Sequence, residues 1–125
     1  MGPERAANMS PAQWALEAEV RFSSHLDTPV TPMLPLQAVW SQTERKSTSG
    51  VVIGPAQRIG REAALRAVTI DAAWQVFMHD EIGSIEPGKR ADFVVLSDDP
   101  LTAPDVRNIK VDRTLIDGAT VYKRL

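Results

Sequence analysis

The chain has 125 residues, 43% of them hydrophobic, which is enough for one compact domain with a modest core. Its 14 Lys and Arg residues are scattered among 16 Asp and Glu residues, and the net charge of -2 excludes a basic surface for nucleic acid or an anionic membrane. Cysteine, a membrane-length apolar run and the apolar core of a secretory signal are all missing, so we expect a soluble, cytoplasmic protein without a disulfide framework.

A helix and a strand are predicted near the start of the chain. Ser10 is suited to cap a helix whose first position is Pro11, and we expect this helix to run to about Glu19. Residues 20–24 then predict a strand, which ends in the polar, proline-containing run HLDTPVTP at residues 25–32. Any chemistry at the end of this strand is expected in that run.

Helices are predicted again between residues 35 and 78. Pro35 begins a helix with apolar residues at helical spacing, which fades by residue 46, and residues 47–60 are predicted to be mainly loop. Apolar residues recur at helical intervals over residues 61–78. Because Thr69 or Asp71 is suited to cap a new helix inside that span, we expect two helices or one kinked helix.

The last third of the chain predicts a small antiparallel β unit. The sequence EPGK at residues 86–89 is typical of a type II turn, with one strand ending before it and another beginning after it. The run FVVL at residues 93–96 predicts a strand buried on both faces. Residues 111–116 and 119–123 flank Asp117-Gly118, a dipeptide typical of a type I′ hairpin turn.

The order of these elements predicts an α+β fold with two structural layers. Residues 1–80 offer one strand surrounded by helices, and residues 81–125 offer a few short strands. Neither segment is self-sufficient, because its strands would leave unpaired edges. We therefore divide the chain at residue 80 into two segments that depend on each other.

His25 and Asp27 are the first candidates for chemistry. They are two residues apart at the predicted strand end, so a strand that persisted this far would direct both side chains to one side. An imidazole and a carboxylate can coordinate a metal or exchange protons. The alternative is structural, with His25 satisfied by its neighbours and Asp27 capping the turn before Pro29.

Other polar and aromatic residues are interpreted structurally. His79, Asp80 and Glu81 are consecutive at a predicted helix end and point in different directions, which favours a solvated terminus over a metal site. Lys89 and Arg90 are expected on the solvated surface. The tryptophans are spaced too widely for an aromatic platform and are expected to pack in the core (Trp14, Trp40 and Trp74).

Several motifs, in order, resemble the C-terminal part of metal-dependent amidohydrolases. The run IGSIEPGKRADFVVL at residues 82–96 is similar to a signature near the end of amidohydrolase-superfamily chains. The run ALRAVTIDAA at residues 64–73 resembles a helix of that family, and Asp117-Gly118 resembles its terminal hairpin. Residues 21–30 resemble the eighth barrel strand and following loop in the branch of N-acyl-D-amino-acid and N-substituted formamide hydrolases, although Leu26 departs from the usual pattern.

The resemblance implies a fold and a site. Residues 1–80 would derive from the last strand and helices of a (β/α)₈ barrel, and residues 81–125 from a composite β-sandwich domain. Asp27 would stand at the eighth-strand aspartate, the catalytic residue that in the family takes a proton from metal-bound water and delivers it to the leaving amine. His25 would lie in the substrate pocket or support the ligands of the metal. Intact relatives would hold a divalent metal, zinc, with Asp27 as one ligand.

A complete site is not expected in this chain. Its only histidines are His25 and His79, so the His-x-His pair and the other ligands of the family are missing and no metal is expected in this chain alone. A whole barrel, which needs roughly 200 residues, does not fit either. The resemblance implies the C-terminal portion of a hydrolase of non-peptide carbon–nitrogen bonds, inactive when isolated. Its expected partners are the missing barrel portion or another copy of the chain.

Two other functions remain open. A non-catalytic module that binds itself or a partner would use the apolar faces and sheet edges that the missing barrel would otherwise cover. A small-molecule binding protein would use residues 25–31. The only support for this function is that these residues are expected in a loop, where binding residues are common.

Overall fold

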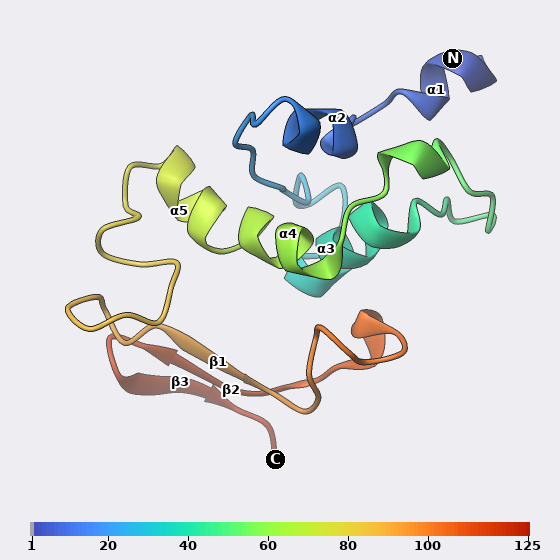
Figure 1. Ribbon diagram of the computed structural model, residues 1–125. Helices are drawn as coiled ribbons and strands as arrows, with labels where there is room; N and C mark the ends of the chain where they lie inside the picture. The colour runs from blue at the N-terminus through green and yellow to red at the C-terminus, as the bar shows by residue number, and fades with distance from the viewer. Residues whose placement is uncertain (1) are drawn as a thin grey trace.

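The computed structural model describes residues 2–125, which form a helical layer above a three-stranded sheet (Figure 1). The predicted α+β class is therefore confirmed. In chain order the elements are α1 (Pro3–Ala7), α2 (Ala12–Glu17), α3 (Pro35–Glu44), the 3-10 turn η1 (Pro55–Gln57), α4 (Arg61–Ala67), α5 (Ile70–Gln75), β1 (Phe93–Leu96), the 3-10 turn η2 (Val106–Asn108), β2 (Val111–Ile116) and β3 (Ala119–Lys123).

The predicted cap of α2 is wrong, whereas the predicted start of α3 is confirmed. Ser10 takes a positive φ of 50°, outside the extended geometry of a capping residue, and Pro11 occupies the N-cap without a side-chain hydrogen bond. The helix is also shorter than predicted, and Glu19 beyond its end has a φ of 55°. In α3, Pro35 occupies the first turn, and Arg45, with a left-handed φ of 53°, ends the helix.

Residues 20–24 are extended but do not form the predicted strand. Within residues 2–125 no strand lies beside them, and the backbone N–H of Ser24 instead donates to the carbonyl of Ala67 at 2.9 Å. A strand is defined by its hydrogen bonds to a neighbour, so β propensity alone does not produce one. The turn that follows starts at Asp27, which has a φ of 53°.

Residues 61–78 form two helices, one of the two predicted outcomes. Thr69 separates α4 from α5, but it does not cap α5 with its side chain. Its hydroxyl donates instead to the carbonyl of Leu65 at 2.8 Å, a group in the last turn of α4 that also accepts the N–H of Val68 at 3.2 Å. Thr69 therefore adds a hydrogen bond to the last turn of α4, and it is also the residue at which α5 begins.

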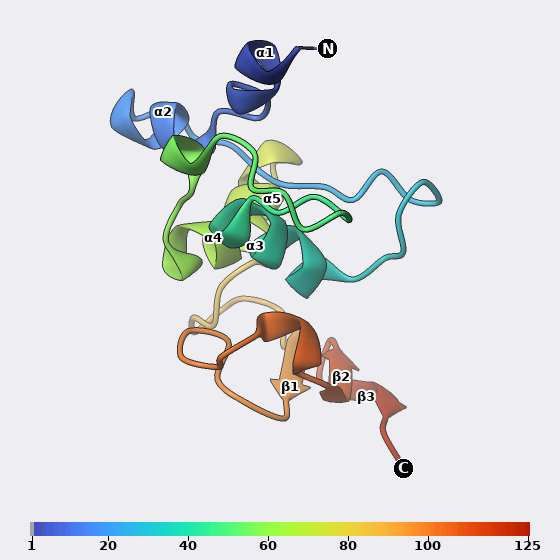
Figure 2. The same ribbon diagram turned by 90° about the vertical axis from the view of Figure 1, so that its right-hand side faces the viewer.

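The main core lies between α3, α4 and the segment that follows β1. Val39 and Ala64 come from the helices, and Ala103, Val106 and Ile109 come from the later segment. Figure 2 shows this later segment, drawn in orange, folding back under the helices. Helical layer and β layer are thus joined by shared buried apolar surface, the dominant favourable contribution to folding.

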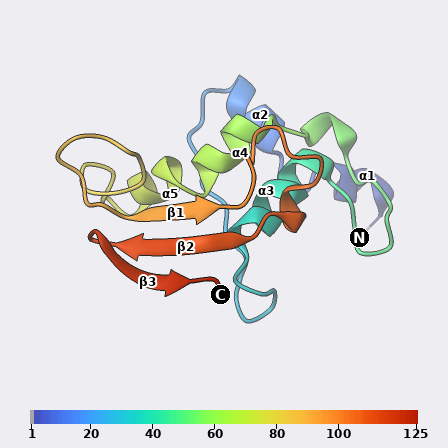
Figure 3. The ribbon, with the colours of Figure 1, turned by 90° about the horizontal axis from the view of Figure 1, so that it is seen from below.

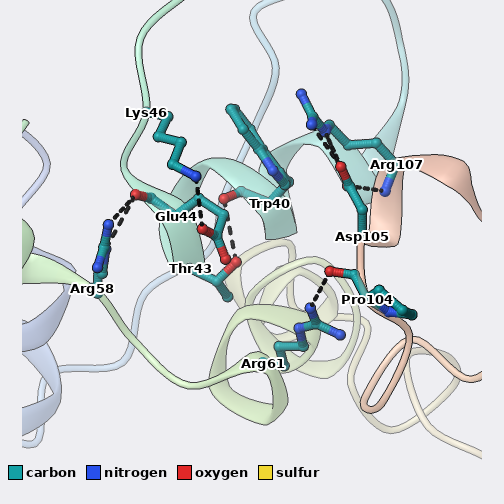
Figure 4. Close-up of polar contacts among 9 residues, drawn as sticks. All are labelled: Trp40, Thr43, Glu44, Lys46, Arg58, Arg61, Pro104, Asp105 and Arg107. Atoms are coloured by element: carbon teal, nitrogen blue, oxygen red, sulfur yellow. Dashed lines mark hydrogen bonds and ion pairs between the residues drawn. The ribbon is translucent and has the colours of Figure 1, made fainter. Parts of the chain in front are cut away.

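Two arginines also hold the later segment against the helices (Figure 4). The guanidinium of Arg61 at the start of α4 donates to the carbonyl of Pro104 at 3.5 Å. Arg107 in η2 stacks over the ring of Trp40 in α3, with 3.9 Å between its guanidinium carbon and the ring centroid. The carboxylate of Asp105 accepts from Arg107 at 2.6 Å and so fixes the orientation of that guanidinium.

The three strands form an antiparallel sheet in the order β1-β2-β3, with β3 at one edge (Figure 3). Phe93 pairs with Leu115, and Thr114 pairs with Tyr122. The turn between β2 and β3 is the predicted dipeptide: Asp117 and Gly118 have φ values of 51° and 78°, as a type I′ turn requires. The hairpin is thus confirmed in its position and in its turn.

Two predictions around β1 need correction. The turn at residues 86–89 is confirmed, because Gly88 has a φ of 95° and Lys89 donates to the carbonyl of Glu86, but no strand precedes it. The strand β1 is present, yet Val94 and Val95 are exposed rather than buried. An apolar run indicates which side chains favour burial, but a second covering layer must exist for burial to occur.

Candidate functional site

His25 and Asp27 lie where the extended segment turns into the loop before α3. The backbone N–H of Asp27 donates to Nδ1 of His25 at 3.1 Å. Both residues are exposed, and within residues 2–125 the carboxylate of Asp27 has no hydrogen-bond partner. The ring of His25 thus accepts from the turn, whereas the carboxylate of Asp27 caps nothing within residues 2–125. A carboxylate free of internal partners remains available for chemistry.

The loop that carries Asp27 is held by its own hydrogen bonds. The N–H of Val30 donates to the carbonyl of Asp27 at 2.8 Å, and the hydroxyl of Thr31 donates to the carbonyl of Leu26. Figure 2 shows this loop, in light blue, projecting away from the helical layer. The side chains of Val30, Met33 and Leu34 on it are exposed.

A cavity of about 590 Å³ lies between the extended segment, α2 and α3, and His25 lines it. Gln42 in α3 donates to the hydroxyl of Ser24, while its own Oε1 is buried and has no partner within residues 2–125. Asp27 is not part of the lining. The two candidate residues therefore face different surroundings, which the period-2 geometry of a strand did not predict.

Arg45 also lines this cavity and was missed by sequence reasoning. Its guanidinium donates to the carbonyls of Met9 at 2.7 Å, Ser10 at 3.0 Å and Ile53 at 3.0 Å. Burial lowers the pKa of Arg45 from its ordinary value. Three carbonyl partners give this residue a structural role, and no local sequence signal distinguishes it from the other arginines.

The His79-Asp80-Glu81 cluster does not converge on a point. Nε2 of His79 lies 3.9 Å from the carboxylate of Asp80, while the carboxylate of Glu81 turns away to pair with Arg90 at 2.7 Å. Within residues 2–125 there is no group of three His, Asp or Glu residues that could hold a metal. A divalent metal normally needs three or four protein ligands, so the described residues do not by themselves fit one.

Lys89 is not the solvated surface residue that was predicted. Its side chain is only 12% exposed, and its ammonium donates to the carbonyl of His79 and the hydroxyl of Ser84, both at 2.6 Å. Hydrogen bonds from Ser84 and Lys89 lower the pKa of Glu86. The ammonium of Lys89 thus bonds to groups within and just before the signature run. The turn at residues 86–89 places Lys89 within reach of them.

Two other signature residues have structural roles. Asp92 accepts the backbone N–H of Asp117 at 2.7 Å, which ties the start of β1 to the hairpin turn. Gly83 has a φ of 92° and lies against α5, where an added methyl would stand 2.7 Å from the methyl of Ala73. These two residues of the signature run therefore shape the backbone in this part of the fold.

The tryptophans follow the core prediction only in part. Trp40 packs against the main core and under Arg107. Trp14 and Trp74 are exposed, and Arg21 lies over the ring of Trp74 at 4.9 Å from the centroid. These two rings would need further protein surface to become buried.

Comparison with known proteins identifies the family. The sequence profile described as "Amidohydrolase family" matches residues 1–122, so the chain belongs to the amidohydrolase family. The N-substituted formamide deformylase of Arthrobacter pascens is 34% identical over 116 residues, which are 91% of this chain and 21% of that protein. The protein LONG AFTER FAR-RED 3 of Arabidopsis thaliana is 36% identical over 101 residues, 78% of this chain and 17% of that protein.

Two solved structures share the fold. An amidohydrolase from Thermotoga maritima MSB8 matches 99% of this chain and 27% of its own, with a TM-score of 0.66 and 28% identity. The guanine deaminase of E. coli matches with a TM-score of 0.65 and 22% identity over 98% of this chain and 36% of its own, which is a likeness of fold alone. The chain therefore spans about a fifth of the curated relatives and about a third or less of these structures.

The amidohydrolase family is generally metal-dependent. In the described part of the chain, no helix is both long and apolar enough to cross a membrane.

Proposed function

We propose that this chain is the C-terminal portion of a hydrolase that cleaves non-peptide carbon–nitrogen bonds. Residues 20–24 would belong to the last strand of its barrel, and β1–β3 would belong to its β-sandwich domain. The proposal is carried by the match over residues 1–122 to the amidohydrolase family, together with the 21% of the Arthrobacter pascens relative that this chain covers. The extended but unpaired segment before Asp27 adds support, since it would gain hydrogen bonds from neighbouring strands.

Asp27 is the residue that we propose for the chemistry. Water would add to the carbonyl carbon of an amide, the carbon–nitrogen bond would break, and a carboxylic acid and an amine would leave. The Asp27 carboxylate would accept a proton from the water and deliver it to the amine nitrogen, the work of a general base and then a general acid. Its exposed position without an internal partner is what such a role needs.

The proposal includes a divalent metal, zinc, in the intact protein. Asp27 is the one residue here that we propose as a ligand, and the others would come from the missing barrel portion. Since the described residues do not make a metal site, we assign them no metal-dependent step and expect the isolated chain to be inactive.

The test uses the chain joined to the barrel sequence that precedes it in the intact protein. We expect release of formate and amine from N-substituted formamides, and a fall in kcat of about 10²–10⁴-fold for Asp27→Asn. Asp80→Asn is the matched control, because Asp80 is an exposed aspartate in the turn that follows α5. An Asp27→Asn enzyme with the rate of the wild type would contradict the assignment of Asp27, and absence of hydrolysis by the wild type would contradict the proposed function.

A second candidate is a non-catalytic module that associates with itself or a partner. It is favoured by the exposed apolar side chains of the sheet, which include Val94, Val95 and Tyr122, and by the free edge of β3. This candidate needs no Asp27 chemistry and predicts a dimer of the isolated chain. A well-folded monomer at high protein concentration would rule it out.

A further inference from the structure

Asp27 is held by its backbone alone, and His25 provides one of the two contacts. The N–H of Asp27 donates to Nδ1 of His25 at 3.1 Å, and the carbonyl of Asp27 accepts the N–H of Val30 at 2.8 Å. The carboxylate of Asp27 has no hydrogen-bond partner within residues 2–125. The backbone is therefore fixed on both sides of this residue, while its side chain stays free.

The turn at Asp27 determines where that free carboxylate points. Asp27 has a φ of 53°, in the left-handed region that few residues other than glycine adopt and that aspartate tolerates better than most. A side chain that accepts a backbone N–H two residues further on favours such a turn over an extended strand. The ring of His25 is therefore one cause of the direction that the Cα–Cβ bond of Asp27 takes.

This contact is local, because both partners lie within three consecutive residues. The side chain of residue 25 reaches the N–H of residue 27, as the side chain of Asn or Asp does in an Asx turn. No other element of the fold supplies an atom to it. The contact therefore does not depend on which surface covers residues 25–27 in the intact protein.

The contact also fixes the position of the proton on the ring. A nitrogen that accepts a hydrogen bond must keep its lone pair, so a neutral His25 carries its proton on Nε2. A histidine that binds a metal through one nitrogen normally carries the proton on the other and donates it. In His25 one nitrogen is occupied and the other is protonated, so neither is free to bind a metal.

We propose that His25 is a positioning residue, which acts through Nδ1 on the backbone of Asp27 to direct its carboxylate, and that it is neither a metal ligand nor a proton acceptor in the reaction. This inference rests on the proposed function, because it takes Asp27 as the carboxylate that accepts and delivers the proton.

The first experiment detects the contact in the chain itself and needs no turnover. NMR can measure a scalar coupling between two nitrogens across an N–H···N hydrogen bond. In isotope-labelled chain at about pH 8.5, where an ordinary imidazole is neutral, we expect a cross-peak between the amide nitrogen of Asp27 and Nδ1 of His25. His79 is the internal control and should give no such cross-peak, since its Nδ1 has no hydrogen-bond partner within residues 2–125.

The second experiment replaces the ring by two amides that each imitate one of its nitrogens. The side-chain oxygen of Asn can stand where Nδ1 lies and accept the N–H of Asp27, whereas the side-chain nitrogen of Gln can stand where Nε2 lies and donate. In the chain joined to its barrel sequence, we expect His25→Asn to keep kcat near the wild-type value. His25→Gln and His25→Ala should lower kcat about 10²-fold, because Asp27 is misplaced, and should change KM little.

The outcomes separate this inference from the proposed function. A folded chain without the cross-peak overturns the positioning role and leaves the hydrolase standing. The role is also overturned if His25→Asn loses as much kcat as His25→Ala, or if all three variants keep the wild-type rate. A kcat retained by His25→Gln alone would assign the function to Nε2, and so to a contact with metal or substrate. A cross-peak in the chain without hydrolysis of any amide by the joined wild type overturns the hydrolase and keeps the contact. Far-UV circular dichroism checks that each variant is folded.

Discussion

Gly83 is the residue of the signature run at which a substitution is expected to cost most. An added methyl would stand 2.7 Å from the methyl of Ala73 and 2.9 Å from Cα of Ile70, and the φ of 92° is unfavourable for any side chain. We expect Gly83→Ala to lower the free energy of unfolding by about 2–4 kcal/mol, as overpacking and backbone strain combine. Denaturant unfolding followed by circular dichroism measures this loss.

Gly88 provides the control for that prediction. Its φ of 95° is nearly the same, but nothing lies within 4 Å of an added methyl. Gly88→Ala should therefore carry only the backbone cost, about 1 kcal/mol. If the two variants lost the same stability, the close contact between Gly83 and α5 would not be the cause.

At the scale of elements, the turn η2 begins with an ion pair between Asp105 and Arg107. The carboxylate of Asp105 accepts from the side chain and backbone N–H of Arg107, and these bonds lower the pKa of Asp105 from its ordinary value of 3.8 to about 2. A lowered carboxyl pKa stabilises the folded state above pH 4 and loses that contribution as the pH falls from about 4 to about 2. Because the pair is partly exposed, water limits the contribution to about 1 kcal/mol or less.

The prediction for this element is a difference in acid sensitivity. The wild type should lose a small increment of stability between pH 4 and pH 2 that Asp105→Asn lacks, measured as the urea midpoint at each pH. Asp98→Asn is a suitable comparison, since Asp98 is an exposed aspartate of the same region. A variant at Asp105 that kept the whole acid dependence would show that other carboxylates cause it.

Elements with strong local signals were predictable from the sequence. Pro35 opened α3, and Asp117-Gly118 gave the hairpin, because proline fixes φ and this dipeptide accepts positive φ wherever it stands. The strand at residues 20–24 was not predictable in the same way. Its existence depends on a neighbouring strand, and none lies beside it within residues 2–125.

At the scale of the whole molecule, the exposed face and edge of the sheet decide how the chain behaves alone. If the self-associating module is correct, Val121→Lys and Tyr122→Lys should each convert a dimer to a monomer, because a charge on β3 opposes pairing at that edge. Sedimentation velocity measures the change, and far-UV circular dichroism checks that each variant is folded. Lys123→Gln is a control on the same strand that adds no charge.

A dimer that persisted in both variants would place the contact elsewhere on the molecule. In the proposed hydrolase the same surface would instead meet the missing portion of the protein. In that case the joined chain should show less exposure of Tyr122 than the isolated chain, measured by its reactivity toward tetranitromethane.

The candidate site shows how far sequence reasoning extends. It identified Asp27 and His25 as residues capable of chemistry, and it found the family from the signature run. It did not predict that Asp27 begins a turn, that His25 accepts the N–H of Asp27, or that Lys89 is held by His79 and Ser84. The contacts of His25 and Lys89 depend on the backbone turns beside them. Residue type alone does not predict the direction of a side chain at a turn.

The sequence by itself determined the family, the start of α3 and the hairpin, and which side chains favour burial, because each follows from local geometry or from residue type. Tertiary structure decided which of those side chains are covered, whether an extended segment becomes a strand, and which polar groups meet. Val94 and Val95 are apolar by sequence and exposed in the fold, since burial requires a partner surface from elsewhere in the protein.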